Sequence, residues 1–504
     1  MFFKRAKRTH AAVPESVGER YEDLALASRM EDNERMFREV FKGDDTMIFR
    51  RFGPEGMFLI LLVDGMIDDQ TVNLNIVRRL EMTVKPGDPA PDMERIEHEI
   101  VSIGEAKRTS KMLDIFDSLL YGDTILLADG STEALILSSK GFERRGIGES
   151  QNEKGIKGPQ EAFSEAFMPN LALIRRKLRN PALKFTFRKI GRVTRTNVVL
   201  CYVDGLCEKG LIEEINARLD EIEINGVLDS NYVSELICDS PGSPFRTTGS
   251  TERPDIVAAR LLEGRAALVI DGSPTVLTLP HLLVEYFQSQ NDYYRSFWGA
   301  SLSRILRYVG FFVAISAPAL YAAILGFHPE LLPTTLLISV ARARQGVLIP
   351  TVAELMFMLL ALEILQEAGL RAPPAIGQSL SIVGGLILGQ AAVDAHIVSA
   401  PVVIVVALWA VTNMMLPNLR SPIIVMTFGL LALSGALGLY GYALGMCALG
   451  VGLASMRSFG VPYTDFAVPY SFRELRDSII RAPWRKMAQR PFSPKRGGEE
   501  SEDI

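Results

Sequence analysis

Residues 308–327 read YVGFFVAISAPALYAAILGF, and this stretch decides the architecture. Its 20 residues carry no charged side chain. At about 1.5 Å rise per helical residue they match the ~30 Å hydrocarbon thickness of a bilayer. Two more long apolar runs follow, at residues 397–416 and 423–455, whereas residues 1 to about 300 have a mixed polar composition. We therefore predict a soluble α/β N-terminal half followed by an α-helical, polytopic membrane domain.

The composition also predicts where the chain divides. The N-terminus is charged and lacks the apolar core of a secretory signal, so we expect the soluble half to stay cytoplasmic and the first span to direct insertion. The expected segments are a flexible N-terminal segment (1–40), a first α/β subdomain (41–150), a linker or helical segment (151–189), a second α/β subdomain (190–300), a transmembrane helical domain (301–460) and a basic cytoplasmic tail (461–504).

Two patterns recur in the soluble half. FLILLVDGM at residues 58–66 and NVVLCYVDGL at 197–206 each predict a buried strand, a turn at Asp-Gly and a following helix. GDTILLADGSTEALIL at 122–137 and GRAALVIDGSPTVLTL at 264–279 each predict a hairpin with Asp-Gly at its turn. The first Asp-Gly pairs lie 140 residues apart and the second 142. This nearly constant offset favours two related α/β subdomains; the alternative is two independent hairpins.

The apolar runs predict about six spans, with four or five as alternatives. The run at 423–455 would be about 50 Å long as one helix, too long for a bilayer core, so we expect it to turn near Tyr440-Gly441. An even number of spans keeps the basic tail on the cytoplasmic side, as the positive-inside rule requires. Arg342 and Arg344 are exceptions, and the segment that holds them could be re-entrant or interfacial. The expected spans are 308–327, 347–366, 377–393, 397–416, 423–439 and 441–456.

Few charged or polar side chains fall inside these spans. Glu354 is predicted well inside the second span, where a lone carboxylate is a candidate pore or polar site. The alternatives are a hydrogen bond from Glu354 to a neighbouring helix and a second span that lies at the membrane surface. Gln390 and Asp394, at the end of the third span, are the next candidates.

Small residues mark two candidate helix-packing faces. Gly385 and Gly389 form one GxxxG pair, and Gly441 and Gly445 form another. Such faces allow two helices to approach closely, although the pattern is also frequent by chance.

Other signals exclude several classes of function. The four cysteines form no CxxC pair, so we expect neither a disulfide framework nor a metal site. A net charge of -5 argues against nucleic-acid binding. The nucleotide-loop, zinc-protease and hydrolase motifs are missing from the sequence, so we expect no enzyme activity and no cofactor. A basic cluster, Arg175 to Arg179, is interpreted as a solvated helix face or as a membrane or subunit contact.

The tail carries two further signals. Ser471 and Glu474 are spaced as in a capping box, which predicts a helix start. Trp484, among Arg481, Arg485 and Lys486, is typical of an anchor at the level of the lipid headgroups.

A series of ordered motifs resembles the A subunit of GerA-type spore germinant receptors. The likeness runs from about residue 40 to about residue 465. The motifs are GPQEAF (158–163), SPF (243–245), STERPD (250–255), LLEGRAALVIDGSP (261–274), FQSQNDYY (287–294), FHPELLPT (327–334), IGQSLSIVGGLILGQAAV (376–393) and RSFGVPY (457–463).

This resemblance implies a function that no local chemistry would reveal. Members of this family sit in the inner membrane of endospores and act with a transporter-like B subunit and a lipoprotein C subunit. The resemblance implies a self-associating, channel-like subunit that converts nutrient sensing into germination. A non-conducting scaffold for the B and C subunits and a secondary transporter remain alternatives.

Overall fold

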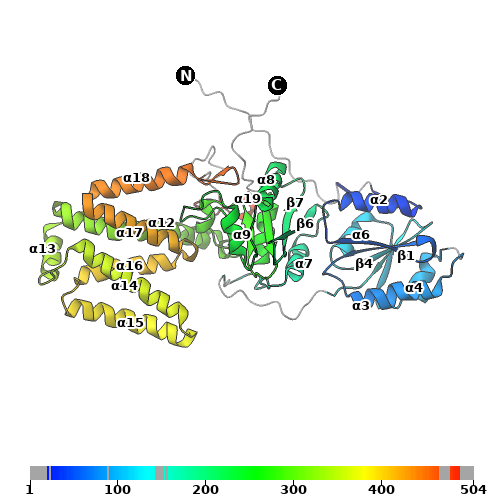
Figure 1. Cartoon of the computed structure of the whole chain (residues 1–504), viewed down its shortest axis with the longest axis horizontal. Coiled ribbons are helices and arrows are strands. Elements are labelled where there is room, and N and C mark those ends of the chain that lie inside the picture. Colours follow the sequence, from blue (N-terminus) through cyan, green and yellow to red (C-terminus); the bar gives the residue numbers. More distant parts are fainter. Residues whose placement is uncertain are drawn as a thin grey trace, which may run out of the picture.

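The structure is a computed structural model, and it describes residues 20–21, 24–87, 90–141, 153, 157–464 and 477–487. Figure 1 shows three parts in a row: two α/β subdomains follow one another, and a bundle of helices lies at the far end. The expected helix start at Ser471 and the last residues of the tail lie outside the described residues.

The first subdomain is a five-stranded antiparallel sheet covered on both faces. The strand order is β1-β2-β4-β5-β3. Helices α2 (Met30–Val40) and α6 (Met112–Leu119) pack on one face. Helix α4 (Arg78–Thr83) packs on the other with the π-helical segments at 72–77 and 96–100, so successive residues of the central strand are buried on alternate sides. The strands are β1 Met47–Phe52, β2 Phe58–Val63, β3 Ala106–Thr109, β4 Thr124–Ala128 and β5 Ala134–Leu137.

The second subdomain repeats this arrangement. Its strand order is β6-β7-β9-β10-β8. Adding five to each strand number of the first sheet gives this same order. Helices α7 (Phe167–Lys177) and α10 (Pro254–Leu262) cover one face, and α8 (Lys209–Asp220) and α9 (Ser230–Ile237) cover the other. The strands are β6 Leu183–Ile190, β7 Thr196–Val203, β8 Gly249–Thr251, β9 Ala266–Ile270 and β10 Val276–Leu279.

Each subdomain also contains an equivalent pair of hydrogen bonds that the sequence pattern did not reveal. The buried Asn33 side chain bonds both the N–H and the C=O of Ala27, and the buried Asn170 does the same to Ser164. Both predicted hairpins are present. Gly130 and Gly272 occupy their turns with φ of +86° and +85°, a conformation that favours glycine. These matches are what a duplication requires.

Two predicted boundaries are wrong. The expected linker or helical segment at 151–189 does contain a helix, α7, but α7 and most of β6 in this segment are the first helix and first strand of the second subdomain. The expected flexible segment at 1–40 contains α2, whose Phe37 is fully buried against the first sheet. Both helices bury an apolar face that the polar residues around them concealed in the sequence.

The C-terminal half is helical. Within the residues that the structure describes, two stretches are long and apolar enough to cross a membrane by length and composition: Phe297–Phe327 and Pro417–Leu437. Three further apolar helices in the described residues have 10–17 residues: α13, α16 and α18. The helices are α12 Phe297–Phe327, α13 Thr334–Ala343, α14 Thr351–Arg371, α15 Pro374–Asp394, α16 Ala400–Met414, α17 Arg420–Leu437 and α18 Leu439–Ser455.

Each predicted span coincides with a helix, and α13 is the additional one. The long apolar run breaks at Gly438, with φ of +61°, two residues before the expected turn. Phe327, at the end of α12, packs on Gly438, and Val352, at the start of α14, packs on Gly435. These contacts put the end of α12, the turn between α17 and α18, and the start of α14 at the same end of the bundle. Figure 1 places α13 at this end, far from the second subdomain.

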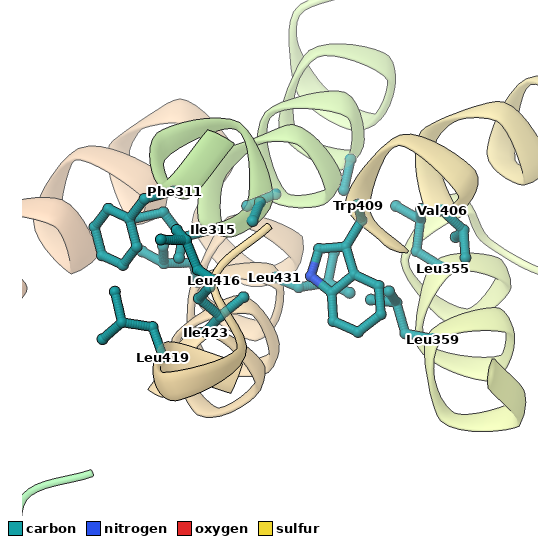
Figure 2. Close-up of a cluster of buried hydrophobic side chains, with 14 of the residues drawn as sticks. Phe311, Ile315, Leu355, Leu359, Val406, Trp409, Leu416, Leu419, Ile423 and Leu431 are labelled. Carbon is teal, nitrogen blue, oxygen red and sulfur yellow. The ribbon is translucent and has the colours of Figure 1, made fainter. Parts of the chain in front are cut away.

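The centre of the bundle is filled by side chains. Trp409 of α16 is fully buried, between leucines of α14 and Leu431 of α17 (Figure 2). Its indole N–H donates to Thr427 Oγ1 at 3.1 Å, and the Thr427 hydroxyl donates to the carbonyl of Ala314 at 3.3 Å. One polar chain therefore links α16, α17 and α12 inside an otherwise apolar core.

Candidate functional site

The segment between the second subdomain and α12 carries buried charge beside the helical half. It includes the 3-10 helix η4 (Leu283–Phe287) and the short helix α11 (Asn291–Tyr294). Two of its carboxylates, Glu285 and Asp292, are buried. We call the ion pairs around them the junction, because they lie where the soluble half meets the first long apolar helix.

Glu285 binds the junction to the second subdomain. Its carboxylate lies 3.1 Å from Arg260 Nη2 of α10 and 3.1 Å from His281 Nδ1, and it also pairs with Arg265 at the start of β9. The Leu282 N–H donates to Glu285 Oε1 at 2.6 Å. Burial alone would raise the pKa of Glu285, but the two arginines and His281 outweigh burial and hold that pKa well below its usual range.

Asp292 binds the junction to the helical half. Arg307 of α12 donates to both carboxylate oxygens of Asp292, at 2.7 and 2.8 Å. Arg304, one turn earlier and fully buried, donates from Nε to the same carboxylate at 3.3 Å. A bidentate arginine pair fixes both distance and orientation, so α12 is held rigidly to α11.

The C-terminal tail completes the junction. Arg304 Nη1 donates to Asp477 Oδ1 at 2.9 Å, and the Tyr293 hydroxyl donates to Asp477 Oδ2 at 2.9 Å. Gln288 Nε2 donates to the Asp477 carbonyl at 2.9 Å. Burial raises the pKa of Asp477, and Arg304 opposes that shift. The tail therefore lies beside the start of α12, at the same end of the bundle as the soluble half.

A fourth carboxylate joins two distant motifs at the junction. Asp255 of the STERPD stretch accepts two hydrogen bonds from Arg253, at 2.8 and 3.1 Å, and one from the Tyr294 hydroxyl at 2.8 Å. Tyr294 belongs to FQSQNDYY. Both motifs carry the family resemblance, but these residues were not predicted as site residues. Their signal was the high density of charge directly before an apolar helix.

Glu354 lies elsewhere, nearer to the start of its helix than the sequence predicted. Helix α14 begins at Thr351, directly after Pro350, so Glu354 lies in the first helical turn rather than well inside a span. Its Oε2 accepts the N–H and the hydroxyl of Ser399, both at 2.8 Å, and its Oε1 accepts Arg344 Nη2 at 3.2 Å. The Glu354 carboxylate is fully buried and accepts hydrogen bonds from the start of the neighbouring helix α16. A hydrogen bond to a neighbouring helix was one of the alternatives considered from the sequence.

The other candidate polar residues do not join Glu354. Gln390 and Asp394 are exposed on α15, and no described contact links either to the Glu354 carboxylate. Within the described ranges, no group of three or more His, Cys, Asp or Glu side chains is placed to hold a metal ion.

The candidate packing glycines differ in how closely they are approached. A Cβ on Gly441 would lie 2.1 Å from the Leu433 carbonyl oxygen, and one on Gly445 would lie 2.5 Å from Leu430. Gly385 and Gly389 have ordinary contacts, with nearest atoms at 3.8 and 3.7 Å. The pair on α18 therefore lies at a tight contact with α17, whereas the pair on α15 does not.

Arg175, the first residue of the basic cluster, is not on a solvated face, whereas Arg179 is exposed. Arg175 is 1% exposed and donates to Asp44 Oδ2 at 2.6 Å and to Thr46 Oγ1 at 3.0 Å. Asp44 and Thr46 belong to the first subdomain, so this arginine lies between the two subdomains.

The comparison with protein families gives the chain its assignment. The family described as Bacillus/Clostridium GerA spore germination protein matches residues 35–493. The chain belongs to the GerA spore germination family. This result confirms the family predicted from the ordered motifs, and the junction combines three of those motifs in one place.

Individual GerA relatives match over most of their length. Spore germination protein KA of Bacillus subtilis (strain 168) is 38% identical over 436 residues, covering 86% of this chain and 80% of the relative. Spore germination protein GerLA of Bacillus cereus is 32% identical over 473 residues, covering 93% and 96%. The crystal structure of the N-terminal domain of the A subunit of the Bacillus megaterium spore germinant receptor GerK3 is 30% identical, with a TM-score of 0.41, and covers 52% of this chain and 98% of that one.

Proposed function

We propose that this GerA-family chain is the A subunit of a spore germinant receptor and acts without enzyme chemistry. In this role it sits in the spore inner membrane and passes a nutrient signal from its soluble half to its helical half. The observation that supports the proposal is the junction. Buried ion pairs at Glu285 and Asp292 hold the second subdomain and α12 together, so a displacement of the subdomain is transmitted to the first apolar helix.

The membrane topology in this proposal is six spans, formed by α12 and by α14 to α18. Its support is that α12 begins beside the second subdomain and that the tail returns to the same place through Asp477. An even number of crossings follows if both ends of the helical half face the spore core. Arg342 and Arg344 are the two exceptions to the positive-inside rule, and the charge of Arg344 is neutralised by its ion pair with Glu354.

The transduction mechanism in this proposal is an oligomer with a channel-like path, working with a transporter-like B subunit and a lipoprotein C subunit. The centre of a single bundle is occupied by Trp409 and its neighbours (Figure 2), so the proposed path runs between copies of the chain. The two alternatives, a non-conducting scaffold and a transporter, predict different currents. Ion conductance of the purified protein in planar bilayers, with and without its partners, distinguishes them.

The proposal is tested by separating signalling from assembly. Spores that lack their own germinant receptors receive either Arg307→Gln, which breaks the bidentate pair with Asp292, or the control Arg295→Gln, at an exposed arginine of the same segment. We expect Arg307→Gln to reach the inner membrane at a normal level but to lose the response to a mixture of L-amino acids and glucose. The control should keep both. Normal germination with Arg307→Gln contradicts a role of the junction in signalling.

A further inference from the structure

A short hairpin follows the last apolar helix. Strands β11 (Arg457–Ser458) and β12 (Val461–Pro462) pair antiparallel. Phe459 and Gly460 form the turn between them, with φ of +49° and +80°. Two-residue turns with positive φ at both positions strongly favour Asn, Asp or Gly at the first, so a phenylalanine there is strained. Backbone strain of this kind persists only where the surrounding structure holds the residue in place, and it is concentrated at functional sites.

The surrounding structure here is the second subdomain. The Phe459 ring is fully buried in the apolar cluster between the sheet and helices α8 and α9. The Arg218 guanidinium lies 4.3 Å from the ring centroid. The Phe459 N–H donates to Asp239 Oδ2 at 2.8 Å, and the same carboxylate pairs with Arg218 at 2.6 Å. A residue beyond the helical half thus forms part of the core of the soluble half.

Residues on either side of Phe459 extend this contact to the junction. The Ser458 hydroxyl donates to the Thr247 carbonyl at 2.7 Å and accepts the His281 N–H at 3.0 Å. The Leu283 N–H donates to the Tyr463 carbonyl at 3.2 Å. His281 and Leu283 lie in the segment that contains Glu285. The second subdomain is therefore attached to the first and the last helix of the helical half. Ion pairs attach it to α12, and this hairpin attaches it to α18.

We propose that the Phe459 hairpin is a releasable latch, closed in the resting protein and withdrawn during signalling; this inference rests on the proposed transduction role. The two attachments differ in a way that identifies which one opens. Separating Arg304 and Arg307 from Asp292 would leave the Asp292 carboxylate buried without an arginine partner, which is costly. Withdrawing Phe459 relieves a strained backbone and leaves no charge unpaired, because Arg218 keeps Asp239 and Glu214 as partners.

The closed latch is tested on the full-length protein in detergent micelles. Ser458→Cys is introduced with Cys238→Ser and Cys447→Ser, which remove the two less buried native thiols. Because Ser458 is fully buried, we expect the new thiol to react slowly with a maleimide. Adding Phe459→Ala should raise the rate at least tenfold. Phe312→Ala, at an exposed phenylalanine of α12, is the matched control and should leave the rate unchanged. Equal rates with and without Phe459→Ala overturn the latch.

Release is tested in spores that carry the Ser458→Cys protein as their germinant receptor A subunit. A mixture of L-amino acids and glucose should increase maleimide labelling at position 458 several-fold before the spores lose their optical density. If labelling stays low while the spores germinate, the hairpin is a fixed anchor and the proposed release is overturned. Failure of the unsubstituted chain to restore germination contradicts the proposed function instead. The micelle measurement still decides whether Phe459 holds the hairpin closed.

Discussion

Buried carboxylates connect the second subdomain to the helical half through ion pairs. Glu285 lies among Arg260, Arg265 and His281, and Asp292 lies between Arg304 and Arg307. Each carboxylate pairs with two arginines whose side chains are at most 15% exposed. Exposed ion pairs elsewhere in the chain, such as Arg95 with Glu99, contribute little because water screens them.

The first prediction concerns Glu285. Glu285→Gln removes the charge but keeps the shape, which leaves Glu263 as the remaining carboxylate partner of Arg260 and Arg265. We expect a loss of about 1–3 kcal/mol in the stability of the second subdomain, because buried donors lose a charged acceptor. Chemical denaturation of the purified protein in micelles measures this loss. The control Glu99→Gln, in a pair whose side chains are 61% and 67% exposed, should change stability by less than about 0.5 kcal/mol. Equal effects of the two variants would show that the junction pairs contribute no more to stability than an exposed ion pair does.

The second prediction concerns Lys184, which lies between the two subdomains and donates to the Val40 carbonyl at 2.7 Å. Burial lowers the pKa of Lys184 from 10.5 to about 8. Between these two pH values the unfolded chain binds more protons than the folded chain, so stability should rise with pH across that window. Below pH 8 both states are protonated and the full cost of burying the charge remains.

Thermal unfolding at pH 7.5 and pH 10 measures this dependence. Lys184→Met should remove most of the rise, whereas Lys111→Met, at an exposed lysine, should preserve it. If the rise survives Lys184→Met unchanged, another group causes it.

At the scale of elements, the helical hairpin of α17 and α18 depends on glycine at particular positions. The chain reverses at Gly438, whose φ of +61° is unfavourable for other residues. Gly441 and Gly445 then face α17 so closely that a Cβ would overlap its atoms. The GxxxG pattern on α15 looks the same in the sequence but has room for a methyl group.

The third prediction uses this difference. Gly441→Ala should disrupt the contact of α18 with α17, because the methyl carbon would lie 2.1 Å from a backbone oxygen that has little freedom to move. We expect a loss of at least about 2 kcal/mol in bundle stability, of the size seen for overpacked cores. Gly389→Ala should be neutral or stabilising by up to about 1 kcal/mol, since alanine is the better helix former. Unfolding in micelles, followed by circular dichroism, compares the two variants; equal stability would exclude tight packing at Gly441.

At the scale of the whole molecule, the tail and the soluble half meet at the base of the bundle. The Ser301 hydroxyl donates to the Arg481 carbonyl at 3.1 Å, and Trp484 lies 6.2 Å from Tyr293 between ring centroids. The loop with α13 lies at the opposite end, where Leu348 is 96% exposed. The two ends of the bundle should therefore lie on opposite sides of the membrane.

The fourth prediction tests this arrangement. Single cysteines are introduced by Ser250→Cys, Arg485→Cys and Leu348→Cys, each with Cys238→Ser and Cys447→Ser, and labelled with a membrane-impermeant maleimide in sealed vesicles. The thiols at positions 250 and 485 should react from the same side and the thiol at 348 from the other. Labelling of positions 250 and 485 from opposite sides would exclude an even number of spans.

The sequence by itself determined the division into a soluble and a helical half, the paired hairpins and the GerA family. These features are local: alternating burial, Asp-Gly turns and apolar runs depend on neighbouring residues. Only the tertiary structure decided which charges are buried and with what partners. Glu285, Asp292 and Asp477 are separated by up to 192 residues and look like ordinary surface carboxylates in the sequence. The same limit concealed Phe459, because burial and ion pairing are set by elements that are distant along the chain and meet only when it folds.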